Sequence, residues 1–457
     1  MKKTSKTYEI DMCDGPIVSR LLLFTGPLVF SSILQILFNA ADVIVVGKFA
    51  GDNSLAAVGS VGPVTNLIIN LFMGLSIGAN VMASRFYGAK DDKHFKRTLH
   101  TAMSVSGALG IFLGLIGIII TRQILVWMGS PDEVINLATI YLRLYFCGIP
   151  AQSIYNFGSA ILRSTGDTKR PMYYLAFAGI INVFLNLIFV VPLKMDVAGV
   201  ALATIISQYI SAILVVICLL KEEGILKLNI KELCVDKDIF LRMVRIGVPA
   251  SIQGIMFSVS NVIIQSSVNS FGATVVAGNA AAGNVEGFVY VSMNSFYQSC
   301  MTFVSANVGA NKPERINKIV IRAEILVTLV GAILGNILYM FGSEILSLYT
   351  DSDAVAKAGM VRLLYILVTY FLCGMMDVMV GAVRGLGYAI MPMIVTIVGV
   401  CFVRLFWIFT FFQTPRFHET KYLYLTYPVT WSLTFIAHTI CFVIVKKKFN
   451  KRMIGNS

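Results

Sequence analysis

The sequence predicts an all-α integral membrane protein: twelve transmembrane helices in two six-helix lobes, related by pseudo-twofold symmetry along the membrane normal. Three observations predict this fold. Of the 457 residues, 57% are hydrophobic and 13% are charged, whereas a soluble domain carries about 25% charged residues. Almost every apolar run exceeds the roughly 18 residues that mark a membrane-spanning helix. The two halves of the chain also repeat their loop residues at one fixed offset.

The apolar runs number twelve. They lie near residues 21–46, 55–84, 98–120, 134–162, 172–193, 198–220, 240–270, 275–308, 316–341, 356–383, 391–412 and 424–445. The longest polar stretch between runs predicts a cytoplasmic connector over 221–238, between an N-terminal lobe (1–220) and a C-terminal lobe (239–457). Because each lobe has an even number of helices, the lobes are parallel rather than inverted repeats.

The repeat appears in the residues that flank the predicted helices, at an offset of 221 positions. Matched pairs include Gly51 with Gly272, Gly88 with Gly309, Arg163 with Arg384, Gly166 with Gly387, and Pro171 with Pro392. Duplicated helix bundles are typical of secondary transporters, which place the substrate site between the repeats.

Basic residues gather on one side of the predicted membrane. The net charge is +13. If both termini share one side, that side carries 28 of the 37 basic residues, and the opposite loops carry six. This asymmetry indicates a multi-pass protein of the bacterial cytoplasmic (inner) membrane with both termini in the cytoplasm. The basic excess therefore reflects topology and contact with membrane lipids, and we expect no nucleic-acid partner.

Several function classes are disfavoured. The eight cysteines show no paired spacing, which argues against a disulfide framework or a metal site of that kind. No phosphate-binding GxxxxGK[ST] motif occurs, so ATP-driven transport is not expected. Four histidines in 457 residues offer little for an integral-membrane enzyme. We expect no enzyme activity, no cofactor other than a coupling ion, and a monomer.

Five segments are informative when they are taken together and in order. They are 41–47 (ADVIVVG), 55–59 (LAAVG), 163–172 (RSTGDTKRPM), 199–204 (GVALAT) and 303–315 (FVSANVGANKPER). In this order the chain resembles the multidrug and toxic-compound extrusion (MATE) family. The resemblance implies export of organic compounds in exchange for H⁺ or Na⁺.

The resemblance also implies a polar cation site in the N-terminal lobe. The matching positions are Asp42, Asn156, Asn182, Asn186 and Thr204. The chain departs from the family where some relatives carry a second Asp, at Asn186. Another branch carries a Glu where Phe257 stands, and an Asp nearer Cys373 than Asp377. These departures leave open whether H⁺ or Na⁺ is the coupling ion.

Asp42 is also a candidate from physical chemistry alone. It lies in an apolar run with no basic residue nearby, where a charge costs at least about 2.5–3.5 kcal/mol near the bilayer centre. Such a carboxyl group is either protonated or neutralised by a bound cation. The structural alternative is an interfacial carboxylate that water reaches.

Asn182 and Asn186 lie four positions apart and therefore share one helix face. Their amide oxygens, with a carboxylate, form a hard ligand set that suits Na⁺ or a hydrogen-bonded protonated acid. The structural alternative is that the two amides only join helices.

Glu286, Asp377 and Arg404 are charged residues within predicted helices of the C-terminal lobe. The two acids could contact cationic substrates or ions. Arg404 could instead neutralise one of them as a buried ion pair. The sequence leaves both interpretations open.

These observations predict a cation-coupled (H⁺ or Na⁺) antiporter that exports amphipathic, often cationic, organic compounds by alternating access. The alternative is a flippase for lipid-linked oligosaccharides or lipids, which would need a more cationic central cavity for phosphate groups.

Overall fold

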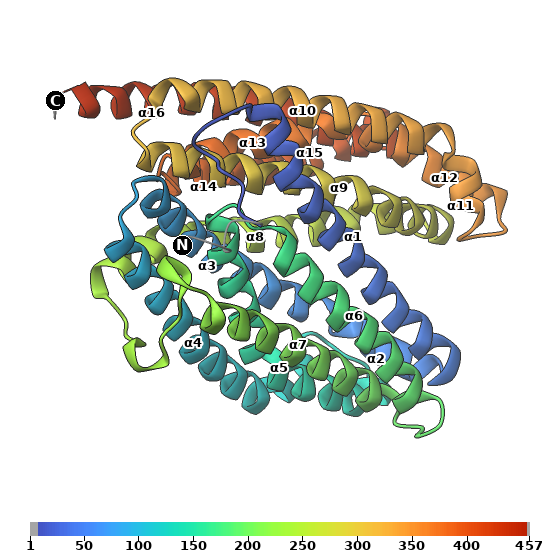
Figure 1. Ribbon diagram of the computed structural model, residues 1–457. Coiled ribbons are helices and arrows are strands. Elements are labelled where there is room, and N and C mark those ends of the chain that lie inside the picture. Colours follow the sequence, from blue (N-terminus) through green and yellow to red (C-terminus); the bar gives the residue numbers. More distant parts are fainter. Residues whose placement is uncertain (1–7, 455–457) are drawn as a thin grey trace. The chain divides into compact units, whose positions relative to one another are not determined.

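The computed structural model describes residues 8–454, and within that range the secondary structure is helical, with no strand (Figure 1). The helices of the first half are α1 (Ile17–Phe49), α2 (Asp52–Ser60), α3 (Gly62–Gly88), α4 (Asp92–Trp127), α5 (Asp132–Ser164), α6 (Lys169–Val190), α7 (Asp196–Lys221), and the short turns η1 (Gly224–Leu226) and η2 (Ile230–Glu232). The second half contains α8 (Lys237–Asn269), α9 (Ala273–Gly309), α10 (Pro313–Met340), α11 (Gly342–Ser347), α12 (Asp353–Arg362), η3 (Leu363–Leu367), α13 (Tyr370–Gly385), α14 (Ile390–Thr396), η4 (Ile397–Phe402), α15 (Val403–Phe409), η5 (Phe411–Gln413), η6 (Pro415–Phe417) and α16 (Thr420–Ile454).

Twelve helical segments in the described chain match the twelve predicted runs. Ten are long and apolar enough to cross a membrane, and a pair bent by 40°, α12–η3 with α13, forms an eleventh. The twelfth is α9, whose 37 residues include polar side chains such as Asn279 and Glu286. The predicted all-α fold with twelve transmembrane segments is confirmed.

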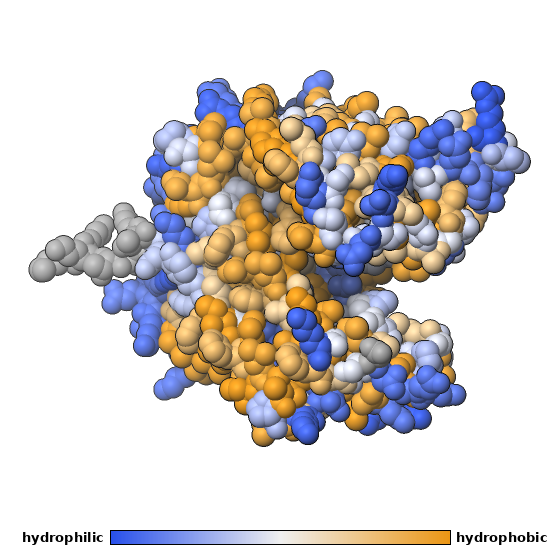
Figure 2. Space-filling view, turned by 90° about the vertical axis from the view of Figure 1, so that its right-hand side faces the viewer, coloured by the Kyte–Doolittle hydropathy of each residue, from blue (hydrophilic) through white to orange (hydrophobic). Residues whose placement is uncertain are grey.

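Large apolar side chains cover much of the outer surface. Ile119 and Met340 are each 76% exposed, and Phe184 is 63% exposed. Figure 2 shows hydrophobic residues across much of the face in view, with hydrophilic residues gathered toward its margins. A surface of this kind is suited to lipid rather than to water, because water-soluble proteins rarely expose large contiguous apolar patches.

The chain divides into two compact units. The first contains residues 8–11 with Gly26–Gly247, and the second contains Met12–Thr25 with the chain from Val248 onward. Two of the three boundaries, at Thr25–Gly26 and Gly247–Val248, fall inside long helices, α1 and α8, near Pro27 and Pro249. A proline inside a helix removes one backbone hydrogen bond and commonly bends the helix there.

The sequence repeat is also a repeat of backbone conformation. Matched positions adopt the same left-handed φ: Gly51 (85°) and Gly272 (86°), Lys90 (55°) and Asn311 (56°), Gly166 (95°) and Gly387 (94°). This region of φ favours glycine because a side chain there is strained. The glycines at 51, 166, 272 and 387 therefore serve the turns between helices.

Helices α4 and α5 approach closely because α4 carries glycines along one face. A Cβ atom added at Gly110 would lie 2.7 Å from the Pro150 Cα atom, and one at Gly114 would lie 2.9 Å from the Phe146 carbonyl oxygen. Small residues at this spacing let helix backbones meet in membranes, where dispersion contacts replace the hydrophobic effect.

We therefore expect Gly110→Ala to lower the free energy of unfolding by about 1–3 kcal/mol, because the new methyl group meets the backbone of α5. Gly107→Ala is the matched control on the same helix, because no atom lies within 4 Å of the place that its methyl group would occupy. The control is expected to be neutral, or more stable by about 0.5–1 kcal/mol. Thermal unfolding in detergent measures both. Equal stabilities of the two variants would contradict this account of the α4–α5 contact.

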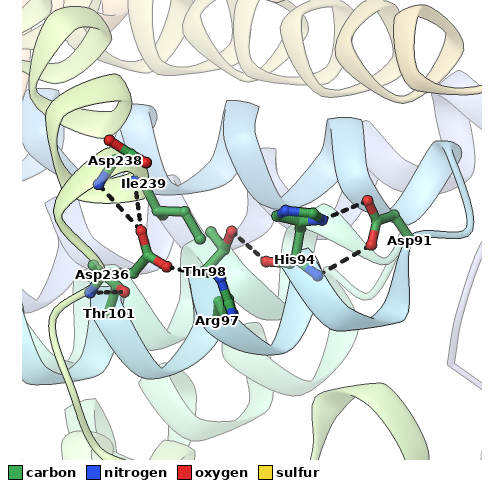
Figure 3. A network of polar contacts seen from close by, with 8 residues as sticks. All are labelled: Asp91, His94, Arg97, Thr98, Thr101, Asp236, Asp238 and Ile239. Carbon is green, nitrogen blue, oxygen red and sulfur yellow. Dashed lines mark hydrogen bonds and ion pairs between the residues drawn. The ribbon is translucent and has the colours of Figure 1, made fainter.

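The predicted connector is held against α4 by polar contacts (Figure 3). The Asp236 carboxylate accepts hydrogen bonds from the backbone N–H groups of Asp238 (3.1 Å) and Ile239 (3.2 Å), which cap the start of α8. Its other oxygen accepts from Arg97 at 3.3 Å, and the Asp236 backbone N–H donates to the Thr101 hydroxyl at 3.1 Å. The connector therefore has a defined conformation in the first unit.

Candidate functional site

Asp42 lies on α1 and faces polar groups of α6 and α7 within the first unit. The Asn186 amide Nδ2 donates to Asp42 Oδ1. The Thr204 hydroxyl lies 3.4 Å from Asp42 Oδ2. The side chain of Asp42 is partly buried rather than freely solvated. In the structure, Asp42 is a partly buried carboxylate that accepts from groups of α6 and α7.

The two asparagines of α6 extend this cluster. Asn186 Nδ2 also donates to Asn182 Oδ1 at 3.3 Å, and Asn182 Nδ2 donates to Thr204 Oγ1 at 3.4 Å. Asn182 is 4% exposed and Asn186 is fully buried. Their spacing of four residues, which predicted a shared face, places both amides beside the carboxylate. Below, Asp42, Asn182, Asn186 and Thr204 are called the Asp42 cluster.

The hydroxyl of Thr204 has a single proton and two acceptors. It lies 3.0 Å from the Val200 carbonyl oxygen and 3.4 Å from Asp42 Oδ2. Since one proton serves one acceptor at a time, Thr204 can leave Asp42 without losing a hydrogen bond. Its oxygen accepts from Asn182 Nδ2 and keeps a second lone pair that can act as a ligand.

The cluster has one unused buried acceptor, Asn186 Oδ1, which has no hydrogen-bond partner in the described structure. Leaving a buried acceptor unpaired costs about 1–3 kcal/mol. A hard cation, or a proton on the neighbouring carboxyl group, would use this oxygen together with those of Asp42, Asn182 and Thr204. No group of three or more His, Cys, Asp or Glu side chains suited to a metal ion occurs within residues 8–454. The donor set thus fits Na⁺ or H⁺ rather than a transition metal.

The structure does not bring Asn156 to this cluster. Its Nδ2 donates to the Gln152 carbonyl oxygen on its own helix at 2.9 Å. The α5 residue that interacts electrostatically with Asp42 is Tyr141. Asn156 lies fifteen positions further along α5, about 22 Å at 1.5 Å per residue. The family resemblance suggested Asn156, but its axial position along α5 separates it from Asp42.

Tyr141 is a residue that sequence reasoning missed. Its side chain is 8% exposed. Tyr141 lies near the start of α5, Asp42 lies near the end of α1, and Thr204 lies in the first half of α7. The position of Tyr141 within its predicted helix could have identified it. Because successive helices are antiparallel, Tyr141, Asp42 and Thr204 all lie toward the same side of the membrane.

In the second unit, Glu286 on α9 pairs with Arg362 on α12. Arg362 Nε donates to Glu286 Oε1 at 2.8 Å, and Nη2 donates to Oε2 at 2.7 Å. Arg362 Nη1 donates to Asn279 Oδ1 at 2.5 Å, and the Tyr424 hydroxyl donates to the same oxygen at 3.2 Å. Asn279 Nδ2 in turn donates to Gln265 at 3.0 Å. Glu286 is thus part of a buried, well-satisfied polar network.

Arg404 does not serve as the partner of Glu286. Its Nη2 donates to the Thr430 hydroxyl at 3.0 Å, and its guanidinium carbon lies 4.0 Å from the centre of the Tyr427 ring. Stacking on an aromatic face is a favourable place for a buried guanidinium group. Arg404 was considered as the cation that neutralises Glu286, but Arg362 has that role.

Asp377 on α13 has no hydrogen bond or ion pair within the described residues. Its electrostatic partner is Arg384, two helical turns further along α13. The structure therefore separates the two acids of the second unit: Glu286 is paired, and Asp377 is not.

Sequence reasoning also missed Glu324, which lies midway along α10. Both of its carboxyl oxygens are buried and lack a hydrogen-bond partner in the described structure. The signal was present, since an acid within the apolar run 316–341 is as unusual as Asp42 in its own run.

Known proteins resemble this chain in sequence over most of its length. The family model described as MatE matches residues 27–188 and again residues 249–410. The probable multidrug resistance protein YoeA of Bacillus subtilis (strain 168) is 29% identical over 382 residues, which cover 82% of each chain. The multidrug export protein MepA of Staphylococcus aureus (strain NCTC 8325 / PS 47) is 22% identical over 348 residues, 75% of this chain and 76% of its own.

Two solved structures illustrate the likeness in fold. The crystal structure of MATE in complex with MaL6 superposes with a TM-score of 0.91, covering 98% of this chain and 100% of that chain at 21% identity. The outward-facing conformation of a multidrug resistance MATE family transporter of the MOP superfamily superposes with a TM-score of 0.90 over the same coverage, also at 21% identity. At this identity the superpositions establish the fold alone.

Proposed function

This chain belongs to the MatE family, and from that premise we propose that it exports amphipathic, often cationic, organic compounds in exchange for H⁺ or Na⁺. The export of drugs is suggested by the names of its relatives, a probable multidrug resistance protein and a multidrug export protein. The observation that carries the coupling is the Asp42 cluster, a carboxylate that accepts from the Asn186 amide and the Thr204 hydroxyl inside a membrane helix bundle.

In the proposed cycle, the cation reaches Asp42 from the outside. Asp42 is 25 residues from the start of α1, about 37 Å along the helix, and is therefore remote from the N-terminus that we place in the cytoplasm. Binding of the cation draws Asn186 Oδ1 and Thr204 Oγ1 toward it and changes how α1, α6 and α7 pack. This repacking favours release of the exported compound. Return to the inward-open state releases the cation to the cytoplasm.

The driving force is sufficient for useful export. One positive charge that moves inward across roughly 150 mV releases about 3.5 kcal/mol, from about 2.3 kcal/mol per 100 mV. At tight coupling this supports a gradient of about a few hundred-fold for a neutral compound. A monovalent cationic compound exchanged one for one would instead depend on the chemical gradient of the ion.

The alternative, a flippase that moves phosphate-bearing lipids, needs unneutralised cations. In the second unit Arg362 is neutralised by Glu286, whereas Arg404 donates to Thr430 and stacks on Tyr427 without an acidic partner among the described residues. The protein is expected to lie in the bacterial cytoplasmic membrane with both termini in the cytoplasm, because of its distribution of basic residues. We also propose that it acts as a monomer.

The test is dye transport by the purified protein in sealed lipid vesicles. We expect dye to move against its gradient when a pH gradient or, in separate vesicles, a Na⁺ gradient is imposed, and to stop when that gradient is collapsed. The ion that supports transport identifies the coupling ion. Absence of dye movement under both gradients would contradict the proposal. Movement of a fluorescent lipid-linked probe in the same vesicles would favour the flippase instead.

A further inference from the structure

We propose that Glu324 on α10 is a second cation site of this protein, in the second unit, and that it binds protons but not metal cations. The carboxyl group lies eleven residues after the start of α10, about 16 Å along a helix of 28 residues. Both carboxyl oxygens are buried and have no hydrogen-bond partner among the described residues. The proposal concerns proton binding itself and does not depend on the nature of the exported compound.

The environment of Glu324 offers no positive charge to neutralise an ionised carboxylate. The positions one turn away on α10 are Val320, Ile321, Val327 and Thr328, which are uncharged. From α9, the titratable group that interacts electrostatically with Glu324 is the fully buried Cys300. Neither helix therefore provides a counter-ion.

Two positively charged groups on neighbouring helices, Arg384 and Lys446, are engaged elsewhere. On α13, Arg384 donates to the Tyr297 hydroxyl at 2.6 Å and to Gln253 at 2.7 Å. On α16, Lys446 donates to Asn317 at 2.7 Å, two turns before Glu324 on α10. On α10 itself, Arg322 is exposed. Other titratable or charged groups of the adjacent segments include Glu286, Tyr290 and Tyr297 on α9, Tyr365 on η3, Tyr370, Cys373 and Asp377 on α13, His438 and Cys441 on α16, of which His438 is bound to Thr396, and the exposed Glu344 on α11.

A buried ionised carboxylate without a partner would cost many kcal/mol, and such groups become neutral instead. Glu324 is therefore protonated in this conformation. A protonated carboxyl group can be buried at the lower cost of an unpaired neutral polar group. The packing of α9 against α10 in this structure therefore requires that Glu324 carry a proton.

Selectivity for protons follows from the absence of oxygen ligands in the described surroundings of Glu324. Alkali and alkaline-earth cations need several oxygen atoms around them. The Asp42 cluster offers such atoms from Asn182, Asn186 and Thr204. One turn from Glu324 on α10, only Thr328 carries a side-chain oxygen, and its hydroxyl donates to the Glu324 backbone carbonyl oxygen at 2.7 Å. Na⁺ would have to enter the Glu324 site almost without ligands, but a proton needs only the carboxylate itself.

Release of this proton requires a change of packing. Water or another acceptor must reach the carboxyl oxygens, and both are sealed in the present arrangement. Opening of the contact between α9 and α10 therefore couples proton release to a conformational change in the second unit. In an exporter, such a site would make the second unit sensitive to pH even if Na⁺ is the ion at Asp42.

The first test is chemical labelling of the intact protein in membranes with dicyclohexylcarbodiimide, which modifies protonated carboxyl groups in apolar surroundings. An exposed glutamate in water is protonated in only about one molecule in 500 at pH 7. We therefore expect the peptide with Glu324 to be labelled about a hundredfold more than the peptide with Glu344. Added Na⁺ should not change labelling at Glu324. Equal labelling of the two peptides, or protection of Glu324 by Na⁺, would overturn the proposal.

The second test is infrared spectroscopy of the reconstituted protein at neutral pH. The wild type should show a protonated-carboxyl C=O band that is absent in Glu324→Gln and unchanged in the control Glu344→Gln. The same band should persist in Asp42→Asn, which separates this site from the Asp42 cluster. A band that is identical in the wild type and in Glu324→Gln would show that Glu324 is ionised, and would exclude the site. Because the labelling test uses the wild-type protein, the proposal stays testable if Glu324→Gln fails to fold.

Discussion

Replacing Asp42 by Asn is expected to abolish cation-driven efflux while the protein still folds and inserts. The substitution removes the one carboxylate of the Asp42 cluster and so removes the group that binds either a proton or Na⁺. Gradient-driven dye efflux from vesicles should fall to the level of vesicles without protein. The free energy of unfolding should change little, because the replacement has nearly the same shape.

The geometry of the cluster explains why this variant should fold. Asn at position 42 would present an amide N–H group where Asn186 Nδ2 now donates to the carboxylate. The Asn186 amide can rotate and accept from that group through Oδ1, which has no partner in the described structure. The rotation sacrifices the 3.3 Å bond to Asn182, a loss of about 0.5–1.5 kcal/mol.

Asp132→Asn is the matched control, because Asp132 is an exposed acid at the start of α5 in the same unit. It should leave both efflux and thermal unfolding unchanged. Wild-type efflux by Asp42→Asn under the gradient that drives the native protein would refute the role of Asp42.

Replacing Arg362 by Met should strongly destabilise the second unit. Arg362 donates two hydrogen bonds to Glu286 and one to Asn279. Removal of one partner from a buried ion pair leaves an uncompensated charge, at a cost of about 3–5 kcal/mol. The measurement is the thermal unfolding midpoint of the purified protein in detergent.

Two further variants show whether the loss of stability comes from the unpaired buried charge. The double variant Glu286→Gln with Arg362→Met should recover much of the lost stability, because no unpaired buried charge remains. Lys357→Met removes an exposed charge from the same helix and should be nearly neutral. If Arg362→Met unfolds at the temperature of the wild type, then Glu286 is already protonated and the pair does not stabilise the fold.

Most of the fold could be predicted from the sequence, because its signals are local. Twelve apolar runs correspond to twelve helical segments in the described residues. The repeat at 221 positions reappears as matched left-handed φ angles, as at Gly166 and Gly387. Run length and turn residues act through the backbone of a few neighbouring positions, and so they can be read without knowledge of the packing.

The candidate site could be predicted only in part. Asp42, Asn182, Asn186 and Thr204 do come together. The pair on α6 was predictable because residues four apart share a helix face. Asn156 was predicted with them but lies at a different height along α5, and Tyr141 takes the position near Asp42. Height depends on how antiparallel helices are staggered, which a helical pattern does not encode.

By itself, the sequence determined that the chain is a duplicated helical membrane protein and that Asp42 lies in an apolar run, whereas the amides beside Asp42 were implied by the family resemblance. Only the tertiary structure decided that Arg362 rather than Arg404 neutralises Glu286, and that Glu324 has no partner in the described chain. The reason is physical. Helical periodicity specifies which residues share a face of one helix, whereas the partner across a contact depends on the rotation and axial position of another helix. Those two quantities arise from the packing of all the side chains together.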